Sequence, residues 1–307
     1  MTKRGWLAVA ILAVWGATLG FHVKRLYFRP YSDLLAAAAR TIPPGTAYYA
    51  VFRGDRQIGW AQTDVDTLPS ATGFLLRDRL IIREPLAPGL DPIRLESEAT
   101  LGPTFTLERF TLNAQGIPGI RHVQGEVHGD STLDVTLRGV GETRRERVAL
   151  EEPVVVAAAW PLRFAARREV EAGERYRLDI YDPLAGGRRP VEITVLRDAE
   201  RTFPDSVTAV DGRYVTARRD TVHAWEVEHD VSGLAMRAWV DEDGRILEAS
   251  LPGGIRLERT AFEFAYFGEH VPDRVPGPVP PGAGDEGGAD GAADAAEDGA
   301  RPRERNP

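Results

Sequence analysis

The side chains with the clearest chemical potential are histidines that occur in two evenly spaced pairs. Five residues separate His122 from His128, and five separate His223 from His229. Imidazole nitrogens are common metal ligands, so this spacing suggests a metal site. Six residues of β-strand span roughly 20 Å, however, whereas a ligand atom lies about 2 Å from its ion. We therefore predict no metal site and interpret all four as strand histidines without a ligating function.

Carboxylates offer two further kinds of chemistry. The segment Asp241–Gly244 resembles part of a calcium loop, but Trp239 and Ser250 stand where the first and last ligands belong. We therefore expect a solvated hairpin turn there. Glu151 and Glu152 do not form a glycosidase pair, because adjacent strand residues point to opposite faces. A glycan hydrolase that combines carboxylates from distant strands stays open as an alternative.

Composition removes several classes of enzyme. The chain has no cysteine, and its only lysines are Lys3 and Lys24. A thiolate nucleophile, a cysteine-ligated metal, a lysine Schiff base and a phosphate-loop lysine are therefore excluded from the body. The net charge is −8, and no stripe of clustered basic residues is present to bind nucleic acid. We predict a protein that is not an enzyme, carries no cofactor and binds no nucleic acid.

An apolar segment near the start of the chain suggests where the protein works. Residues 6–23 carry one ionisable side chain, His22, and lie between two pairs of basic residues. As a helix they extend about 27 Å, close to the roughly 30 Å hydrocarbon core of a bilayer. We predict a single-pass anchor in a bacterial cytoplasmic membrane, with the body on the periplasmic side. Its main apolar residues are Trp6, Leu7, Ile11, Leu12, Trp15 and Phe21.

Two alternatives to this topology stay open. The apolar segment also fits a secretory signal that is cleaved, and a cleaved signal exports the body as well. The basic residues on the two sides of the segment are similar in number, so a body that faces the cytoplasm is a minority alternative.

Three further regions follow the anchor. Residues 31–42 are rich in alanine and end at Pro43, which predicts a helix that spaces the body from the bilayer. Residues 43–267 predict an antiparallel β domain. Residues 268–307 contain nine acidic and four basic side chains among Pro, Gly and Ala. Such a segment buries too little apolar surface to fold, so we predict a disordered tail.

Short alternating runs, separated by Gly, Pro, Asp or Asn, predict the strands of the body. We expect them at 46–53, 57–65, 73–84, 93–101, 104–113, 121–128, 132–138, 144–150, 174–181, 190–197, 214–219, 222–229, 234–240, 246–251 and 255–264. Residues 153–168 are apolar on nearly every side, which indicates a short buried helix between two halves of similar size. The predicted fold is mainly β, a large curved antiparallel sheet that resembles half a barrel and packs on one central helix.

Large aromatic side chains are the remaining candidates for function. Most such residues are core, but a curved sheet with little helix over it exposes part of its apolar face. The candidates for an apolar groove that holds an acyl chain or a partner segment are Trp160, Phe164, Trp225 and Trp239.

Two stretches together resemble known extracytoplasmic domains. Residues 48–60, YYAVFRGDRQIGW, resemble the opening hairpin of β-rich domains that precede bacterial transglutaminase-like domains. Residues 238–247, AWVDEDGRIL, are similar to the hairpin that closes those domains and to late strands of lipoprotein carriers of the LolA/LolB type. The resemblance implies a curved sheet around helices. It provides no catalytic residue, since the cysteine of the transglutaminase part is absent.

These observations favour a non-enzymatic β-domain protein of the cell envelope, anchored in the membrane, that binds a lipid, a lipoprotein or a protein partner. A scaffolding module whose aromatic residues are all buried is one alternative. A carboxylate-dependent glycan hydrolase is the other.

Overall fold

The computed structural model describes residues 31–69, 72–85, 89–129, 131–167, 169–231, 234–251 and 253–267. The predicted anchor at 6–23 and the predicted disordered tail at 268–307 lie outside these ranges, so both stay predictions. Among the described residues, none of the helices has the length and apolar character needed to cross a bilayer.

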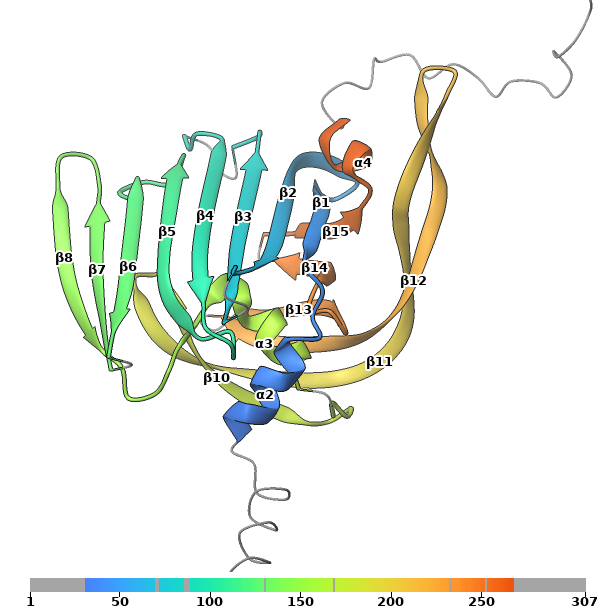
Figure 1. Cartoon of the computed structure of the whole chain (residues 1–307). Helices are drawn as coiled ribbons and strands as arrows, with labels where there is room; N and C mark the ends of the chain where they lie inside the picture. The colour runs from blue at the N-terminus through green and yellow to red at the C-terminus, as the bar shows by residue number, and fades with distance from the viewer. Residues whose placement is uncertain are drawn as a thin grey trace, which may run out of the picture. The chain divides into compact units, whose positions relative to one another are not determined.

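The described chain forms one open sheet of fifteen strands (Figure 1). The short runs of alternating apolar and polar residues predicted a large sheet of this kind. The spatial order is β8-β7-β6-β5-β4-β3-β2-β1-β15-β14-β13-β12-β11-β10-β9, and every pair is antiparallel except β9 with β10. The bounds are β1 Gly45–Arg53, β2 Arg56–Thr67, β3 Phe74–Ile82, β4 Ile93–Leu101, β5 Leu107–Gln115, β6 His122–His128, β7 Thr132–Arg138, β8 Thr143–Ala149, β9 Val155–Val156, β10 Arg175–Asp182, β11 Gly187–Val210, β12 Arg213–Val231, β13 Leu234–Asp241, β14 Ile246–Leu251 and β15 Ile255–Thr260.

The sheet consists of two meanders that meet where the first and last strands pair. β1 runs antiparallel to β15, from Tyr48 opposite Thr260 to Arg53 opposite Ile255. Short turns keep consecutive strands adjacent, which is why sequence order is preserved within each meander. Figure 1 shows the sheet bending so that β10 to β13 pass beneath the ends of the first meander. Helices lie in the concavity of this bend.

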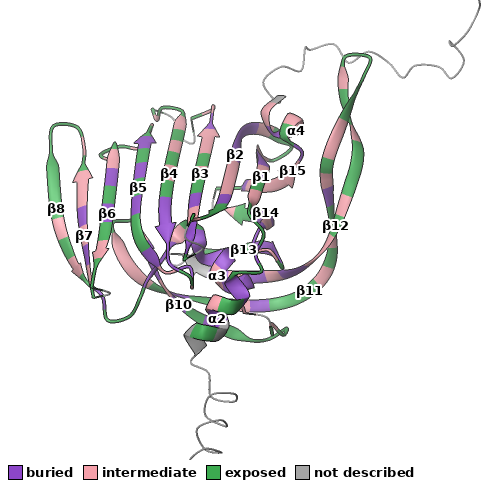
Figure 2. Cartoon of the chain, in the orientation of Figure 1, coloured by how far each residue is buried: buried purple, intermediate pink, exposed green. Residues whose placement is uncertain are grey.

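Two helices fill the inner face of the sheet. These are α2, Tyr31–Ala39, and α3, Trp160–Ala165, which follows a 3-10 turn at Ala157–Ala159. The second confirms the buried helix expected within 153–168, and Pro161 stands in its first turn, where a missing N–H costs nothing. Figure 2 shows the buried residues concentrated on these helices and on the strand segments beside them.

The first helix, which was predicted to be a spacer, packs into the core of the body. Leu35, Ala38 and Ala39 are buried and pack with residues of β2 to β7 in the largest apolar core. The predicted spacer is therefore part of the folded body and ends at Ala39, three residues earlier than expected. Leucine and alanine on one helical face explain this, because that face has an apolar sheet to cover.

Three strand predictions were wrong in the second meander. β11 continues to Val210, well past its predicted end at residue 197, and β12 is continuous across the gap expected at 220–221. The last predicted strand ends at Thr260 and is followed by a helix, α4, Phe262–Phe267. Where β11 ends and β12 begins, both faces of the two strands are largely exposed. The alternation of apolar and polar residues that marks a strand is therefore missing there.

Candidate functional site: an aromatic interior, a charged junction and an exposed arm

Three of the four predicted groove residues come together between α3 and the sheet. Trp160 and Phe164 lie on α3 with ring centroids 6.4 Å apart, and Trp225 on β12 lies 5.9 Å from Phe164, edge to face. Their side chains are 8%, 0% and 8% exposed. Tyr176 on β10 closes the cluster 5.9 Å from Phe164. The structure places these rings in a packed core, and their contact with a ligand stays a prediction.

Trp239 lies in a different cluster from the other three. Its strand neighbours Ala238 and Val240 belong to the aromatic interior around α3, so the alternation of β13 directs Trp239 to the opposite face. There it is 7% exposed and packs with Phe203 of β11. The guanidinium of Arg201 lies 4.5 Å from its ring centroid. The sequence places all four aromatic residues on strands or helices but does not show on which face each one lies.

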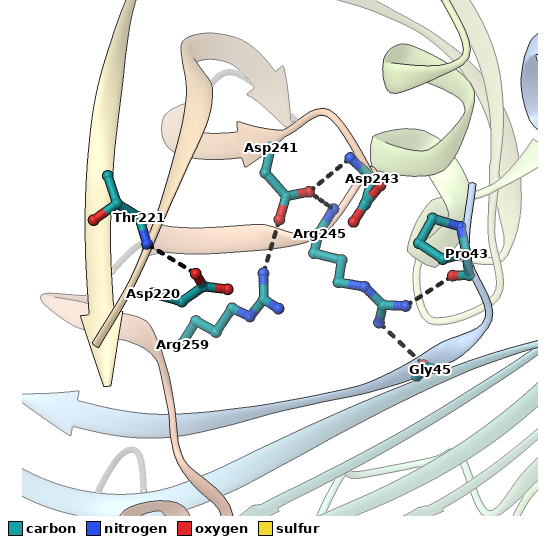
Figure 3. A network of polar contacts seen from close by, with 8 residues as sticks. All are labelled: Pro43, Gly45, Asp220, Thr221, Asp241, Asp243, Arg245 and Arg259. Carbon is teal, nitrogen blue, oxygen red and sulfur yellow. Dashed lines mark hydrogen bonds and ion pairs between the residues drawn. The ribbon is translucent and has the colours of Figure 1, made fainter. Parts of the chain in front are cut away.

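A charged junction holds the β13–β14 turn against the start of β1 (Figure 3). One carboxylate oxygen of Asp241 accepts the backbone N–H groups of Asp243, at 3.0 Å, and Arg245, at 2.7 Å. Its other oxygen accepts Nη1 of Arg259 at 2.7 Å. The Arg245 guanidinium donates to the carbonyl oxygens of Pro43 and Gly45 at 3.1 and 3.0 Å. We call Asp241, Arg245 and Arg259 the junction residues.

The expectation of a solvated turn holds at Glu242, whose side chain is 70% exposed, but not at its two ends. Asp241 and Arg245 are 3% and 7% exposed. Gly244 marks the closest approach: its φ is +71°, and a Cβ there would lie 2.7 Å from the Cα of Leu162. Only glycine satisfies both the positive φ and the contact. Each junction residue has hydrogen-bond partners within the fold, which indicates a structural role.

Burial dominates the electrostatics of this junction. It raises the pKa of Asp241 above its ordinary value, although the hydrogen bond from the Arg245 backbone and the charge of Arg259 both act to lower it. Burial also raises the pKa of Tyr49, on β1, to about 12. At neutral pH the Tyr49 hydroxyl group therefore stays protonated and is not suited to act as a general base.

Asp78 is a carboxylate that sequence reasoning missed. It lies on β3 between Leu76 and Leu80, at a position whose neighbours face the apolar interior. The hydroxyl groups of Thr63 and Ser97, on the flanking strands, donate to it at 2.6 and 3.4 Å. Burial raises the pKa of Asp78 to about 6, against the lowering effect of both hydroxyl groups. The available signal was an acid at an inward position of an alternating strand.

The histidines do not converge. His122 contacts Asn113 at 2.8 Å, and His128 lies 3.7 Å from Asp134. His223 lies between Asp198, at 3.0 Å, and Glu242, at 3.5 Å. His229 is buried beside Trp160, with ring centroids 4.9 Å apart. Within the described ranges, no group of three or more His, Asp or Glu side chains is arranged so that it could hold a metal ion.

The most exposed feature is a two-stranded arm. β10 pairs with β11 only as far as Thr194, and β13 pairs with β12 only from Ala224 onward. Residues 200–210 and 213–223 therefore pair only with one another, and we call residues 200–223 the arm. Figure 1 shows it rising away from the sheet as a twisted ribbon. Asp211 and Gly212 both have positive φ, +50° and +74°, as a tight type I′ turn requires.

The base of the arm is held and its tip is exposed. At the base, Phe203 is buried beneath the Arg259 guanidinium, and Arg201 pairs with Glu248 at 2.7 Å. At the tip, Val210, Tyr214 and Val215 are 48%, 40% and 42% exposed. These three are among only seven large apolar side chains exposed in the described part of the chain. Sequence reasoning overlooked the tip, although Asp211-Gly212 between two strand-forming segments is a hairpin signal.

Comparisons with known proteins give two partial structural matches. No family model matches the chain, and no curated protein matches it. A crystal structure of a β-barrel-like protein of the domain of unknown function DUF1849 from Brucella abortus superposes with a TM-score of 0.46 at 12% identity, covering 70% of this chain and 95% of that one. A DUF1089 family protein from Pseudomonas aeruginosa gives a TM-score of 0.33 at 14% identity, covering 67% and 89%. The antiparallel sheet is established by the strand pairing of this chain itself. Its relation to LolA/LolB-like carriers or transglutaminase-associated domains stays a prediction.

Proposed function

We propose that this chain is a membrane-anchored, extracytoplasmic protein of the cell envelope that binds a protein partner through the arm and catalyses no reaction. The observation that carries the proposal is the exposed apolar tip of the arm. A two-stranded ribbon is marginally stable without a third strand or a packed face. Exposed apolar clusters on soluble surfaces commonly mark interaction sites. An arm that projects with three such side chains is therefore suited to contact another molecule.

The tip favours a protein over a lipid bilayer. Asp211 stands at its apex, with Arg213 two residues later. Inserting the apex into hydrocarbon would bury a carboxylate and the unpaired backbone groups of the turn, each at a cost of several kcal/mol. A protein surface can supply both apolar contact and partners for these charges.

The position of the arm also fits a partner in the compartment beyond the membrane. The described chain begins at Tyr31 in α2, close to the predicted anchor at 6–23 in sequence. Figure 1 shows α2 at the opposite end of the domain from the arm tip. An anchored domain in this orientation directs the arm away from its own bilayer.

A photo-crosslinking side chain placed at position 214 of the full chain tests the proposal in living cells. The matched control is position 184, because Leu184 is 39% exposed and Tyr214 is 40% exposed. We expect a discrete covalent adduct from position 214 and none from position 184. Equal labelling from both positions, or no adduct from 210, 214 and 215, would overturn the proposal.

A further inference from the structure

The sheet ends at an open edge that is separate from the arm. Its strand order terminates at β9, which has two residues, and at β8, which has seven, Thr143–Ala149. β7 occupies one side of β8, and no other strand of the described chain pairs with the second side. Figure 1 shows β8 as the outermost strand of the first meander. A strand with one free side presents a row of backbone donors and acceptors to which a further strand can pair.

The register of β7 with β8 identifies these backbone groups. In an antiparallel pair, every second residue of a strand turns both its N–H and its C=O toward the neighbour. The backbone N–H of Gly139 donates to the carbonyl oxygen of Glu142 at 2.9 Å, and that of Leu150 donates to Ser131 at 2.8 Å, which sets the alternation at both ends of β8. Residues 144, 146 and 148 therefore bond to β7. The N–H and C=O groups that point to the open side belong to residues 143, 145, 147 and 149.

One face of this edge is positively charged. Arg145 and Arg147 lie on the face that is opposite the buried side chains, together with Asp134 and Arg138 of β7. Arg147 pairs with Asp134 at 2.7 Å. Within the described ranges, the guanidinium groups of Arg138 and Arg145 have no ion-pair or hydrogen-bond partner. Three guanidinium groups against one carboxylate leave a charge of +2 on this face of the β7–β8 pair.

The other face of the edge continues the apolar core. Val148 on β8 and Leu137 on β7 are half-buried and pack against the largest core cluster. Arg144 and Glu146 lie on the same face and pair with each other. A strand added to β8 would therefore cover Val148 with an apolar side chain on this face and meet guanidinium groups on the opposite face. Alternating acidic and apolar residues satisfy both requirements.

The arginines oppose pairing with a second copy of this chain. Two β8 strands that meet about a twofold axis run antiparallel, with residues of the same face opposite one another. Every such register that pairs five or more residues of Thr143–Ala149 brings Arg145 opposite Arg145, Arg145 opposite Arg147, or Arg147 opposite Arg147. Like charges directly opposite are destabilising, and charged edges protect sheets from pairing with themselves. The edge therefore favours a strand of opposite charge.

We infer that β8 binds an extended segment of another protein, which adds to the edge of the sheet as a further strand. The segment carries acidic residues opposite Arg145 and Arg147 and an apolar residue opposite Val148. Its backbone bonds to residues 143, 145, 147 and 149 supply affinity, and its alternating side chains supply specificity. This site goes beyond the proposed function of the arm and does not depend on it.

A labelled peptide of strand length with alternating glutamate and valine provides the probe. Fluorescence anisotropy with the purified full chain is expected to show saturable binding, and none for a peptide with lysine in place of each glutamate. Arg145→Glu is expected to weaken binding about tenfold, because it places like charges opposite one another. The matched control is Arg94→Glu, since Arg94 is also exposed but β3 and β5 occupy both sides of its strand, β4. No binding of the glutamate peptide, or equal weakening by the two variants, would overturn the inference.

A second comparison separates strand pairing from charge attraction. Arg145→Ala and Arg145→Pro both remove the guanidinium, but only proline removes the N–H that points to the open edge. We expect the proline variant to bind the peptide about tenfold more weakly than the alanine variant, since one backbone hydrogen bond is lost. Equal affinities of two variants with the wild-type circular dichroism spectrum would overturn the inference. Hydrogen exchange of the wild-type chain tests the same point without a substitution: the peptide is expected to slow exchange in residues 143–149 and not in residues 93–101, and unchanged exchange in 143–149 would overturn the inference.

Crosslinking in living cells tests which molecule occupies the edge. A photo-crosslinking side chain replaces Ala149, which is exposed and whose backbone faces the open side. We expect an adduct heavier than the chain and different from twice its mass, whether or not position 214 gives one. An adduct of twice the chain mass, a crosslink within one chain to residues 268–307, or no adduct from position 149 would overturn the inference and leave the proposal for the arm as it stands.

Discussion

Replacing Asp78 by asparagine tests whether a carboxyl group inside the sheet opposes folding at neutral pH. Asparagine keeps the shape of the side chain. Its carbonyl oxygen can accept the Thr63 hydroxyl, and its amide can donate to Ser97, so both contacts of 2.6 and 3.4 Å have a replacement. The variant therefore removes the charge and little else.

The magnitude follows from linkage. The pKa of Asp78 is raised from 3.8 to about 6, because burial penalises the carboxylate. Below pH 3.8 the carboxyl is protonated in both the folded and the unfolded chain, so it costs nothing. As pH rises from 4 to 7, the unfolded chain loses its proton first, and the penalty on the folded state grows. At about 1.4 kcal/mol per unit of pKa, the full penalty is about 3 kcal/mol. Because the Asp78 side chain keeps some solvent exposure, we expect about 1–3 kcal/mol at pH 8.

Urea denaturation of wild-type and Asp78→Asn chains at pH 4, 5, 6, 7 and 8 provides the measurement. The variant is expected to be more stable by about 1–3 kcal/mol at pH 8, and the difference is expected to vanish near pH 4. Asp134→Asn is the matched control of opposite sign, since Arg147 lowers the pKa of Asp134. That variant is expected to lose stability at neutral pH and to converge with wild type as pH falls. A difference for Asp78→Asn that is independent of pH, or a destabilised variant at pH 8, would refute the reasoning.

Three further predictions concern the turn, the junction and the topology. Gly244→Ala is expected to lower the free energy of unfolding, measured by urea denaturation, by more than 3 kcal/mol, because the new Cβ would lie 2.7 Å from the Cα of Leu162. The control is Gly253→Ala, whose Cβ has no atom within 4 Å, so it is expected to cost only the strain of a positive φ, about 1 kcal/mol. Arg259→Leu is expected to destabilise the chain by about 3–5 kcal/mol at pH 7, because it leaves the buried Asp241 carboxylate without the guanidinium that lies 2.7 Å away. The loss is expected to be smaller in acid, where Asp241 becomes protonated. An equal loss of stability at all pH values would contradict this. Protease added outside intact spheroplasts is expected to digest the body but to spare residues 6–23, and protection of the body would contradict the extracytoplasmic topology.

Alternation of apolar and polar residues was enough to predict most of the sheet. Wherever one face of a strand is buried, the period of two is visible, and β4, β7 and β14 begin and end at the predicted residues. The same rule explains the failure in the arm. Val207, Val210, Tyr214 and Val215 are distributed over both faces of a ribbon that has no core beneath it. A pattern that depends on a buried face gives no signal there.

The candidate site was harder to predict, because it depends on which face each side chain takes and on contacts between distant segments. Trp239 and Trp225 are both tryptophans on neighbouring strands, yet they point into different cores. The turn Asp241–Gly244 looks solvated in sequence, yet its last residue, Gly244, is buried against Pro161 and Leu162 of α3. Arg245 reaches the carbonyl oxygens of Pro43 and Gly45, about 200 residues earlier in the chain. No local pattern encodes a contact of that kind.

The position of α2 links the predicted anchor to the direction of the arm. Leu35 and Ala39 fix the helix in the core, and Arg245 fixes the residues that follow it. Between the end of the predicted anchor at residue 23 and the start of α2 at Tyr31 there are seven residues, 24–30, which extend at most about 25 Å. In the proposed topology, these residues keep the start of α2 within about 25 Å of the end of the anchor. The arm tip, which lies at the opposite end of the domain from α2, would then face away from the bilayer.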